Sequence, residues 1–223
     1  MPRKARAKPK LCGWKFDPVA LAALFLSLIA AGAQLWDWWH GPQIRLIPPD
    51  RVALYSQVAP DGSVAIRIAA NMSYANVAQA QYGDLVLIER AKLKVDQIES
   101  WQRWNAFGEI RESAITRTQD AAPQPLPGQS AVTHFTLFTP VPRVCPNGSS
   151  ACDPMRDYIS PEEMMLQVRT ADRIEFRFEI DLFNGHTLTT SCYVPLSALV
   201  RQKLGNIMRT PLYATCHSPH RHN

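Results

Sequence analysis

A thiol and three imidazoles lie within the last eight residues of the chain. Cys216, His217, His220 and His222 occur in the sequence CHSPHRHN, and thiolate and imidazole are ligands that zinc and copper prefer. A metal site needs ligands on a fixed scaffold, whereas a chain end that contains Pro219 favours a polar tail. We therefore expect no cofactor and keep metal binding by these four residues as an alternative.

Four cysteines follow the first hydrophobic segment and offer disulfide chemistry. Cys145 and Cys152 flank the short loop CPNGSSAC, which Pro146 and Asn147-Gly148 would turn. We predict a disulfide between these two residues and a second one between Cys192 and Cys216. Metal ligation is the rival interpretation, but neither pair has the C-x-x-C spacing typical of metal or redox sites.

Aromatic and histidine side chains are the remaining candidates for binding or catalysis. Trp101 and Trp104 could stack on a sugar ring or anchor a partner, or they could close the core. His134 and His186 have no acid and nucleophile at a recognisable spacing. The sequence contains no G-x-S-x-G, H-E-x-x-H, phosphate-binding glycine loop or dinucleotide motif. We predict a protein that is not an enzyme, with a hydrolase built from distant residues as the less favoured alternative.

The element that decides where these residues act is a hydrophobic run near the N-terminus. Residues 18–36 (PVALAALFLSLIAAGAQLW) carry no charge, and as a helix they span about 28 Å, the thickness of a bilayer core. Six Lys and Arg residues precede the run, which predicts an N-terminus in the cytoplasm. Trp36, Trp38 and Trp39 follow at the exit, where indole rings favour lipid headgroups. We expect a signal-anchor helix in the plasma (inner) membrane.

The same run permits two further interpretations. Ala31-Gly32-Ala33 resembles a signal-peptidase site, so cleavage after Ala33 is the rival to an anchor. Either outcome places the following domain outside the cytoplasm, in the periplasm of a Gram-negative cell. Ala23, Ser27 and Ala31 also form a stripe of small residues at four-residue spacing. Such a stripe lets two helices approach closely and predicts a possible homodimer.

Charge is distributed unevenly along the chain. The formal net charge is +5 and six of the 24 Lys and Arg residues lie in the first 15 positions, so the later domain is nearly neutral. Clustered positive charge on the domain would be needed for nucleic-acid binding, which we exclude. We divide the chain into a basic stub (1–15), a membrane helix (16–39), an extracytoplasmic domain (41–205) and a histidine-containing tail (206–223).

Alternating hydrophobic residues predict a mainly β domain with two defined hairpins. Around Pro60-Asp61-Gly62, the register that matches both apolar faces pairs Val58 with Val64 and Leu54 with Ile68. In the second hairpin, a three-residue loop 183–185 pairs Ile180 with Leu188, Phe176 with Cys192 and Ile174 with Val194. Further strands are expected at 43–48, 84–95, with a bulge near Glu89, and 131–139. The segment 101–110 fits either a strand or irregular structure.

These strands, mostly antiparallel, favour an immunoglobulin-like β-sandwich, with a small barrel as the alternative. One or two short helices complete the prediction. Ser160-Pro161-Glu162-Glu163 is an N-cap, an N1 proline and an acid at N3, so a helix should begin there. Residues 195–204 are the second candidate.

No motif identifies a ligand. The anchor, the neutral domain and the missing catalytic motifs together favour a non-catalytic module that binds or assembles with another envelope protein. A carbohydrate- or metal-binding domain is the alternative.

Overall fold

The computed structural model describes residues 17–58, 62–111, 114–140 and 159–218. Contacts divide the chain into two compact units, Met1–Gly41 and Pro42–Asn223. We describe each unit separately.

The first unit contains one helix, α1 (Pro18–His40). Asp17 begins it, because its Oδ1 accepts a hydrogen bond from the Val19 N–H at 3.0 Å. The hydroxyl of Ser27 donates to the carbonyl of Ala23 at 2.8 Å, so this polar side chain is paired within an apolar stretch. Residues 18–36 are long and apolar enough to cross a membrane, and none of them is buried in the protein. The helix therefore fits an anchor or a signal sequence.

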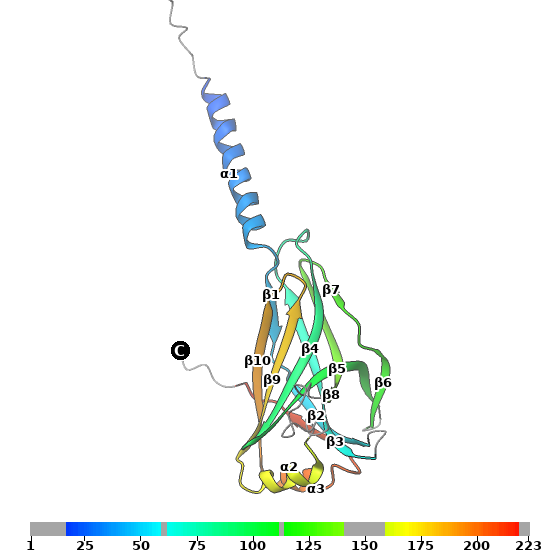
Figure 1. The fold of residues 1–223 in the computed structure, drawn as a ribbon. Coiled ribbons are helices and arrows are strands. Elements are labelled where there is room, and N and C mark those ends of the chain that lie inside the picture. The colour runs from blue at the N-terminus through cyan, green and yellow to red at the C-terminus, as the bar shows by residue number, and fades with distance from the viewer. Residues whose placement is uncertain (1–16, 59–61, 112–113, 141–158, 219–223) are drawn as a thin grey trace, which may run out of the picture. The chain divides into compact units, whose positions relative to one another are not determined.

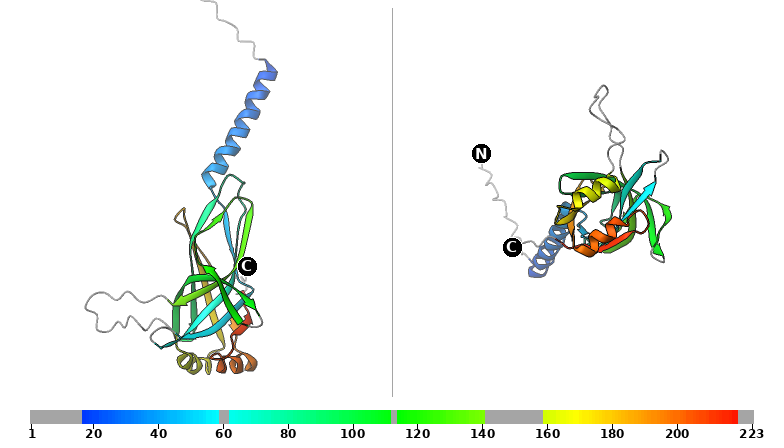
Figure 2. Two further views of the ribbon diagram at one scale, coloured as in Figure 1. Left: turned by 90° about the vertical axis from the view of Figure 1, so that its right-hand side faces the viewer. Right: turned by 90° about the horizontal axis from the view of Figure 1, so that it is seen from below.

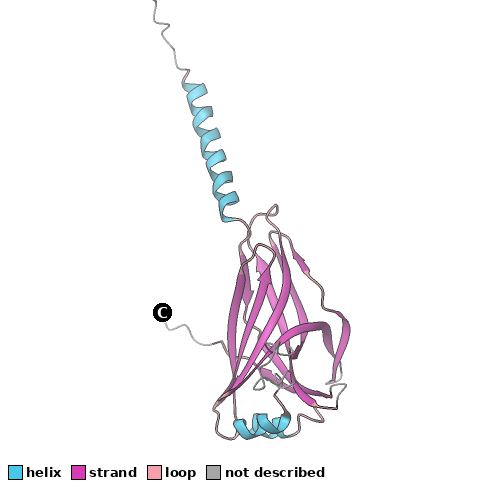
Figure 3. Ribbon diagram, in the orientation of Figure 1, coloured by secondary structure: helices cyan, strands magenta, loops and turns pink. Residues whose placement is uncertain are grey.

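The second unit is mainly β, and its described strands pair into one antiparallel sheet (Figures 1 and 3). The strands are β1 (Ile44–Ile47), β2 (Arg51–Val58), β3 (Val64–Asn76), β4 (Asp84–Val95), β5 (Ile98–Arg111), β6 (Ala114–Asp120), β7 (Gln124–Leu126), β8 (Ser130–Pro140), β9 (Arg173–Leu182), β10 (Thr187–Pro195) and β11 (Leu212–Thr215). Their main order is β10-β9-β4-β5-β8-β3-β2-β11, while β1 pairs with β3, β6 with β5 and β7 with β4.

The sheet curls until the two ends of this strand order meet. Tyr193, in β10, and His217, just after β11, exchange two backbone hydrogen bonds of 2.8 Å. Cys192 and Cys216, one residue earlier on each segment, form a disulfide with a Cα–Cα distance of 5.5 Å. The predicted pairing of these two cysteines is therefore present. A single curled sheet buries one continuous inner face, so the two packed sheets of an immunoglobulin-like sandwich are not confirmed.

Both predicted hairpin registers are confirmed. Val58 lies opposite Val64 and Leu54 opposite Ile68, and Gly62 adopts the left-handed φ of +83° that the turn requires. In the second hairpin, Ile180 lies opposite Leu188 and Phe176 opposite Cys192. In both hairpins the turn residues and the apolar alternation favour the same register. The local sequence was therefore sufficient to predict the strand pairing.

Elsewhere the structure extends or shifts the predicted elements. The undecided segment 101–110 belongs to β5, and the predicted bulge in β4 lies between Val86 and Ile88. The strands β6, β7 and β11 were not predicted. β11 lies in the segment assigned to the C-terminal tail, so the sheet continues past the predicted boundary at residue 205. Four-residue β11 has too short a pattern to indicate a strand, and its pairing with β2 defines it.

Two short helices cover one end of the sheet interior (Figure 2). α2 (Pro161–Val168) begins with the predicted capping box, in which Ser160 and Glu163 bond reciprocally at 3.1 Å. α3 (Ala198–Gly205) has Ser197 as its N-cap. The two helices and the turn after α3 place apolar side chains over the interior: Met164, Val168, Leu204 and Ile207 are all buried.

The neighbouring interior is apolar and closely packed. Val52, Leu54, Phe176, Val194 and Leu212 line a space that leaves no room for a water molecule. This part of the curled sheet is therefore a closed core and not a ligand cavity.

Gln102 compensates for a gap in the sheet. In the described residues β8 pairs with β3 only from Ala69 onward, and no described strand pairs with Ile66 and Ile68 on that side. The Gln102 side chain pairs there instead, accepting from the Ile68 N–H and donating to the Ile66 carbonyl, both at 2.9 Å. A buried amide with both functions paired carries little desolvation cost.

Candidate functional site

A carboxylate lies inside the curled sheet, and it is the most unusual group in the described interior. Glu89 in β4 is completely buried. The bulge between Val86 and Ile88 shifts the side-chain alternation of β4, so that Val86 and Glu89 both face inward. Across the β4–β9 ladder Glu89 lies opposite Ile180, which belongs to the apolar core.

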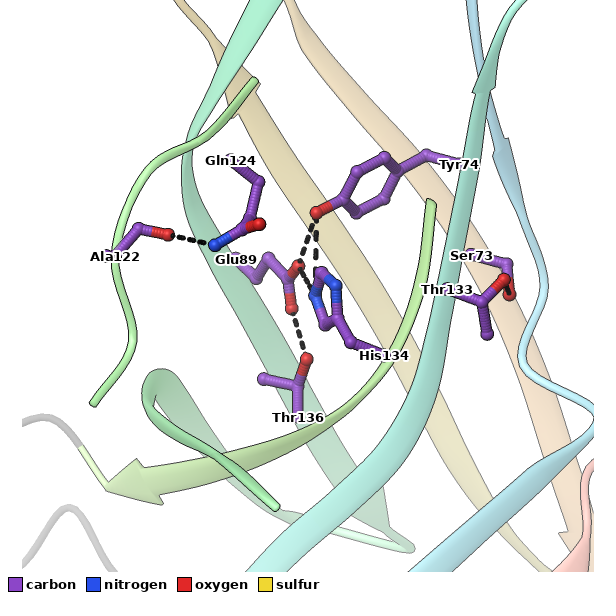
Figure 4. A network of polar contacts seen from close by, with 8 residues as sticks. All are labelled: Ser73, Tyr74, Glu89, Ala122, Gln124, Thr133, His134 and Thr136. Atoms are coloured by element: carbon purple, nitrogen blue, oxygen red, sulfur yellow. Dashed lines mark hydrogen bonds and ion pairs between the residues drawn. The ribbon is translucent and has the colours of Figure 1, made fainter. Parts of the chain in front are cut away.

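Three side chains from neighbouring strands contact this carboxylate (Figure 4). His134 Nε2 lies 2.6 Å and the Tyr74 hydroxyl 3.3 Å from Oε1. The Thr136 hydroxyl donates to Oε2 at 2.7 Å. An ionised carboxylate only accepts hydrogen bonds, so it pairs with all three groups when His134 carries its proton on Nε2. We call Tyr74, Glu89, His134 and Thr136 the Glu89 cluster.

The cluster occupies the place where β5, which lies between β4 and β8 in the strand order, no longer pairs with either of them. Residues 98–103 of β5 pair with residues 90–95 of β4. Residues 102–108 of β5 pair with residues 135–140 of β8. β5 leaves β4 after Arg103, begins to pair with β6 at Ala106, and leaves β8 after Gly108. Glu89 is next to Arg90, where the β4–β5 pairing ends, and His134 is next to Phe135, where the β5–β8 pairing ends. Among the described residues no strand lies between β4 and β8 at this level, and the Glu89–His134 contact joins them directly.

Aromatic rings enclose the cluster. The Phe107 ring centroid lies 4.4 Å from that of His134 in a tilted arrangement, and Tyr74 meets the imidazole edge-on at 5.5 Å. Burial raises the pKa of the Tyr74 phenol, and the Glu89 carboxylate beside it raises that pKa further. Low surrounding polarity strengthens each hydrogen bond and makes an unpaired member costly.

The arrangement can bind a proton but cannot readily reach a substrate. Glu89 and Thr136 expose none of their surface, and 14% of the His134 side chain is exposed. A general base or a nucleophile must touch the group on which it acts. The Glu89 cluster is therefore built to hold β3, β4 and β8 together.

The two tryptophans proposed for ligand stacking lie on opposite faces of β5. Trp101 pairs with Lys92 on the outer face, where the Lys92 ammonium lies 5.5 Å from the ring centroid. Trp104 is 8% exposed and meets Phe107 edge-on in the core, with centroids 5.8 Å apart. A single sugar ring could not stack on both indoles.

The four proposed metal ligands are only partly within the described residues. Cys216 is in the disulfide, His217 is in the backbone bridge to Tyr193, and His220 and His222 lie outside the described ranges. Within those ranges, no three His, Cys, Asp or Glu residues are grouped in a way that could hold a metal ion.

The remaining predicted sites fall on the helix or outside the description. Cys145 and Cys152 lie in 141–158, which is not described. Trp36 and Trp39 are exposed near the C-terminal end of α1, and Trp38 lies in the same turn. Ala23, Ser27 and Ala31 are exposed along α1 as the stripe predicts. Pairing of two copies through that stripe stays a prediction.

Sequence reasoning missed the Glu89 cluster. It identified the phase break near Glu89 but found no acid partner for His134. In the structure Phe135 and Leu137 pack in a small outer cluster with Ala53 and Ala69, while His134, on the opposite face of β8, contacts Glu89. An acid inside an apolar strand was the available signal, but its partners come from strands 15 to 47 residues away.

No protein-family model, no curated protein and no solved structure matches this chain.

Proposed function

We propose that this protein is a single-pass membrane protein whose β domain lies outside the cytoplasm and binds another protein of the cell envelope without catalysing a reaction. The observation that carries the proposal is the unburied apolar helix 18–36, joined directly to a compact β domain. A helix with no buried face in its own chain needs lipid or a partner to cover it.

Charge and redox chemistry support the orientation. The basic residues before the helix favour a cytoplasmic N-terminus under the positive-inside rule. The Cys192–Cys216 disulfide fits an oxidising compartment on the other side of the membrane.

Strand β6 supports partner binding. In the described part of the chain it pairs only with β5, so one row of its backbone donors and acceptors is open to another strand. Most of its residues are exposed. An extended segment of a partner protein can add to such an edge through backbone hydrogen bonds.

Non-catalytic binding agrees with the interior of the domain. The Glu89 cluster is enclosed, and the apolar space beside α2 and α3 has no room for water. Neither place offers a reacting group to a substrate.

Affinity capture from detergent-solubilised membranes tests the proposal. Lysine on an edge strand opposes pairing with another strand, so Thr116→Lys in β6 should lose a stoichiometric partner that the wild-type chain retains. Thr189→Lys, on the exposed part of β10, is the matched control and should keep it. Recovery of no partner with the wild-type chain, or equal recovery with both variants, would contradict binding through β6.

The anchor has its own test. Alkaline carbonate extraction should leave the chain in the membrane pellet, and mass spectrometry of the mature N-terminus should find residues before Gln34. A mature chain that begins at Gln34 would replace the anchor by a cleaved signal peptide.

A further inference from the structure

Three loops meet at the end of the sheet opposite α2 and α3. They comprise residues 75–83, 124–130, which include the short strand β7, and 183–186. Gln129 N–H donates to the Ala78 carbonyl at 3.0 Å, and the Asn76 side chain donates to the carbonyls of Tyr82 and Leu126 at 2.7 and 3.2 Å. We call this the linker end, because Gln43 also lies there and accepts from the Val77 N–H at 3.0 Å.

These loops are packed against one another. A Cβ atom at Gly128 would lie 1.8 Å from the carbonyl oxygen of Gln79, so only glycine permits the approach of the second loop to the first. The third loop is tied to the start of β4, since Phe183 N–H donates to the Leu85 carbonyl at 2.9 Å. The linker end is therefore a defined surface.

The chain enters the β domain at this surface. α1 ends at His40 and β1 begins at Ile44. Four residue steps span at most about 14 Å even when fully extended. If residues 18–36 cross a bilayer, the helix extends four residues past the lipid, so the start of β1 lies within about 20 Å of the point where the helix leaves it.

The composition of the linker end suits lipid contact. Residues 75–83, 124–130 and 183–186 contain no Lys, Arg, Asp or Glu. The charged residues beside them are Arg45, opposite Ala75, and Asp84, opposite Leu126. The end that carries α2 and α3 differs sharply: its polar cleft of about 390 Å³ is lined by Lys94, Asp96, Asp172, Arg173 and Glu175, among others. An uncharged surface loses little solvation free energy on entering the headgroup layer.

Apolar side chains project from the linker end. Phe183, at the tip of the β9–β10 hairpin, is 74% exposed, and Val77 is 48% exposed. Phe183 occupies the first position of a tight turn that Gly185 completes with a φ of +86°. Nothing in the fold requires a phenyl ring there, since another residue would make the same backbone bonds.

We infer that the linker end is a lipid-contacting surface, on which Phe183 and Val77 insert into the headgroup layer of the membrane that α1 crosses. The inference rests on the proposed anchoring of α1. It adds that the β domain rests on the bilayer through a surface of its own. Aromatic and aliphatic side chains at such a boundary bury apolar area while nearby backbone stays hydrated.

Photocrosslinking in native membranes tests the inference with the full chain. Phe183 is replaced by p-benzoylphenylalanine in one variant and Val77 in a second. Leu166 of α2 is the matched control, because it is 61% exposed at the opposite end. We expect a mass increase of one phospholipid at positions 183 and 77, and no such adduct at position 166. Formation of the Cys192–Cys216 disulfide reports that each variant has folded.

Carbonate extraction of the same samples separates the possible failures. A chain that stays in the membrane pellet but gives no lipid adduct at positions 183 and 77, or equal adducts at 183 and 166, overturns the lipid-contacting surface alone. Crosslinking of position 183 to a protein instead of lipid overturns it as well. A chain that carbonate releases from the membrane overturns the anchoring and, with it, the inference.

Discussion

At one end of the β domain, α2 and α3 place apolar side chains such as Met164 and Leu204 over a closed, apolar interior. In the half that contains the linker end, the interior instead holds Glu89, and side chains from β3 and β8 satisfy its carboxylate. The first half is closed by helices and a disulfide, and the second by a polar network and packed loops.

The difference follows from the path of β5. Where β5 pairs with both neighbours, the sheet is continuous and apolar side chains fill it. Where β5 turns away, its backbone pairing with β4 and with β8 ends, and hydrogen-bonding side chains link β4 to β8. A polar network specifies one geometry because every member must be paired, whereas apolar packing tolerates more exchange.

Breaking the network should have the largest effect. Glu89→Ala leaves the buried Tyr74 and Thr136 hydroxyls and the mostly buried His134 without their acceptor, and we expect a loss of about 3–5 kcal/mol in the free energy of unfolding. Glu99→Ala, which removes an exposed carboxylate paired with Lys92, is the control and should cost less than about 1 kcal/mol. Urea unfolding measures both variants.

A triple variant sharpens the same test. Replacing Glu89 and His134 by Leu and Thr136 by Val removes three of the four members together and leaves the Tyr74 hydroxyl as the one that loses its partners, so a large part of the stability should return. If the triple variant lost as much stability as Glu89→Ala, the network would contribute more to stability than the pairing of its own hydrogen-bonding groups.

Removal of the disulfide should have the next largest effect, in the opposite half of the domain. Cys192 and Cys216 are 24 residues apart, and opening a loop of that size costs about 3.5 kcal/mol in the chain-entropy account. Cys192→Ser together with Cys216→Ser should lower the urea midpoint. Among the described residues, the backbone bridge and ring contact of Tyr193 with His217 and the apolar packing of the neighbouring strands would then hold β10 beside β11.

Hydrogen exchange locates that effect. We expect amides near Tyr193 to lose protection first, while amides near Glu89 keep theirs. Simultaneous loss in both halves would contradict two separately closed halves.

The smallest expected effect is an alkaline dependence of stability. The pKa of Tyr74 is raised above the ordinary 10.0 in the folded protein, so above pH 10 the folded state keeps a proton that the unfolded state has lost. Stability then falls as pH rises, by up to about 1.4 kcal/mol per pH unit for this one group. Tyr74→Phe should flatten the dependence.

Tyr213→Phe is the comparison for that measurement. Burial raises the pKa of Tyr213 too, but without a neighbouring carboxylate among its causes. The stability of the Tyr213 variant should therefore fall with rising pH more steeply than that of the Tyr74 variant. A Tyr74 variant with the wild-type slope would show that the phenol does not titrate differently in the two states.

Local patterns were sufficient wherever short-range chemistry and hydrophobic alternation agreed. The two hairpin registers, the capping box at Ser160 and the apolar helix from Pro18 each depend on residues close together in the sequence. Glu89 shows the limit, since its bulge was indicated by the sequence while its partners were not.

The sequence by itself determined an apolar segment of spanning length, a mainly antiparallel β domain and the residues that turn its hairpins, because these are set by composition and local periodicity. Only the tertiary structure decided that one sheet curls to join β10 with β11, that Glu89 meets His134, and that three uncharged loops share one end. Each of these depends on contacts between distant segments, whose free energy is fixed by the path of the whole sheet and not by any local pattern.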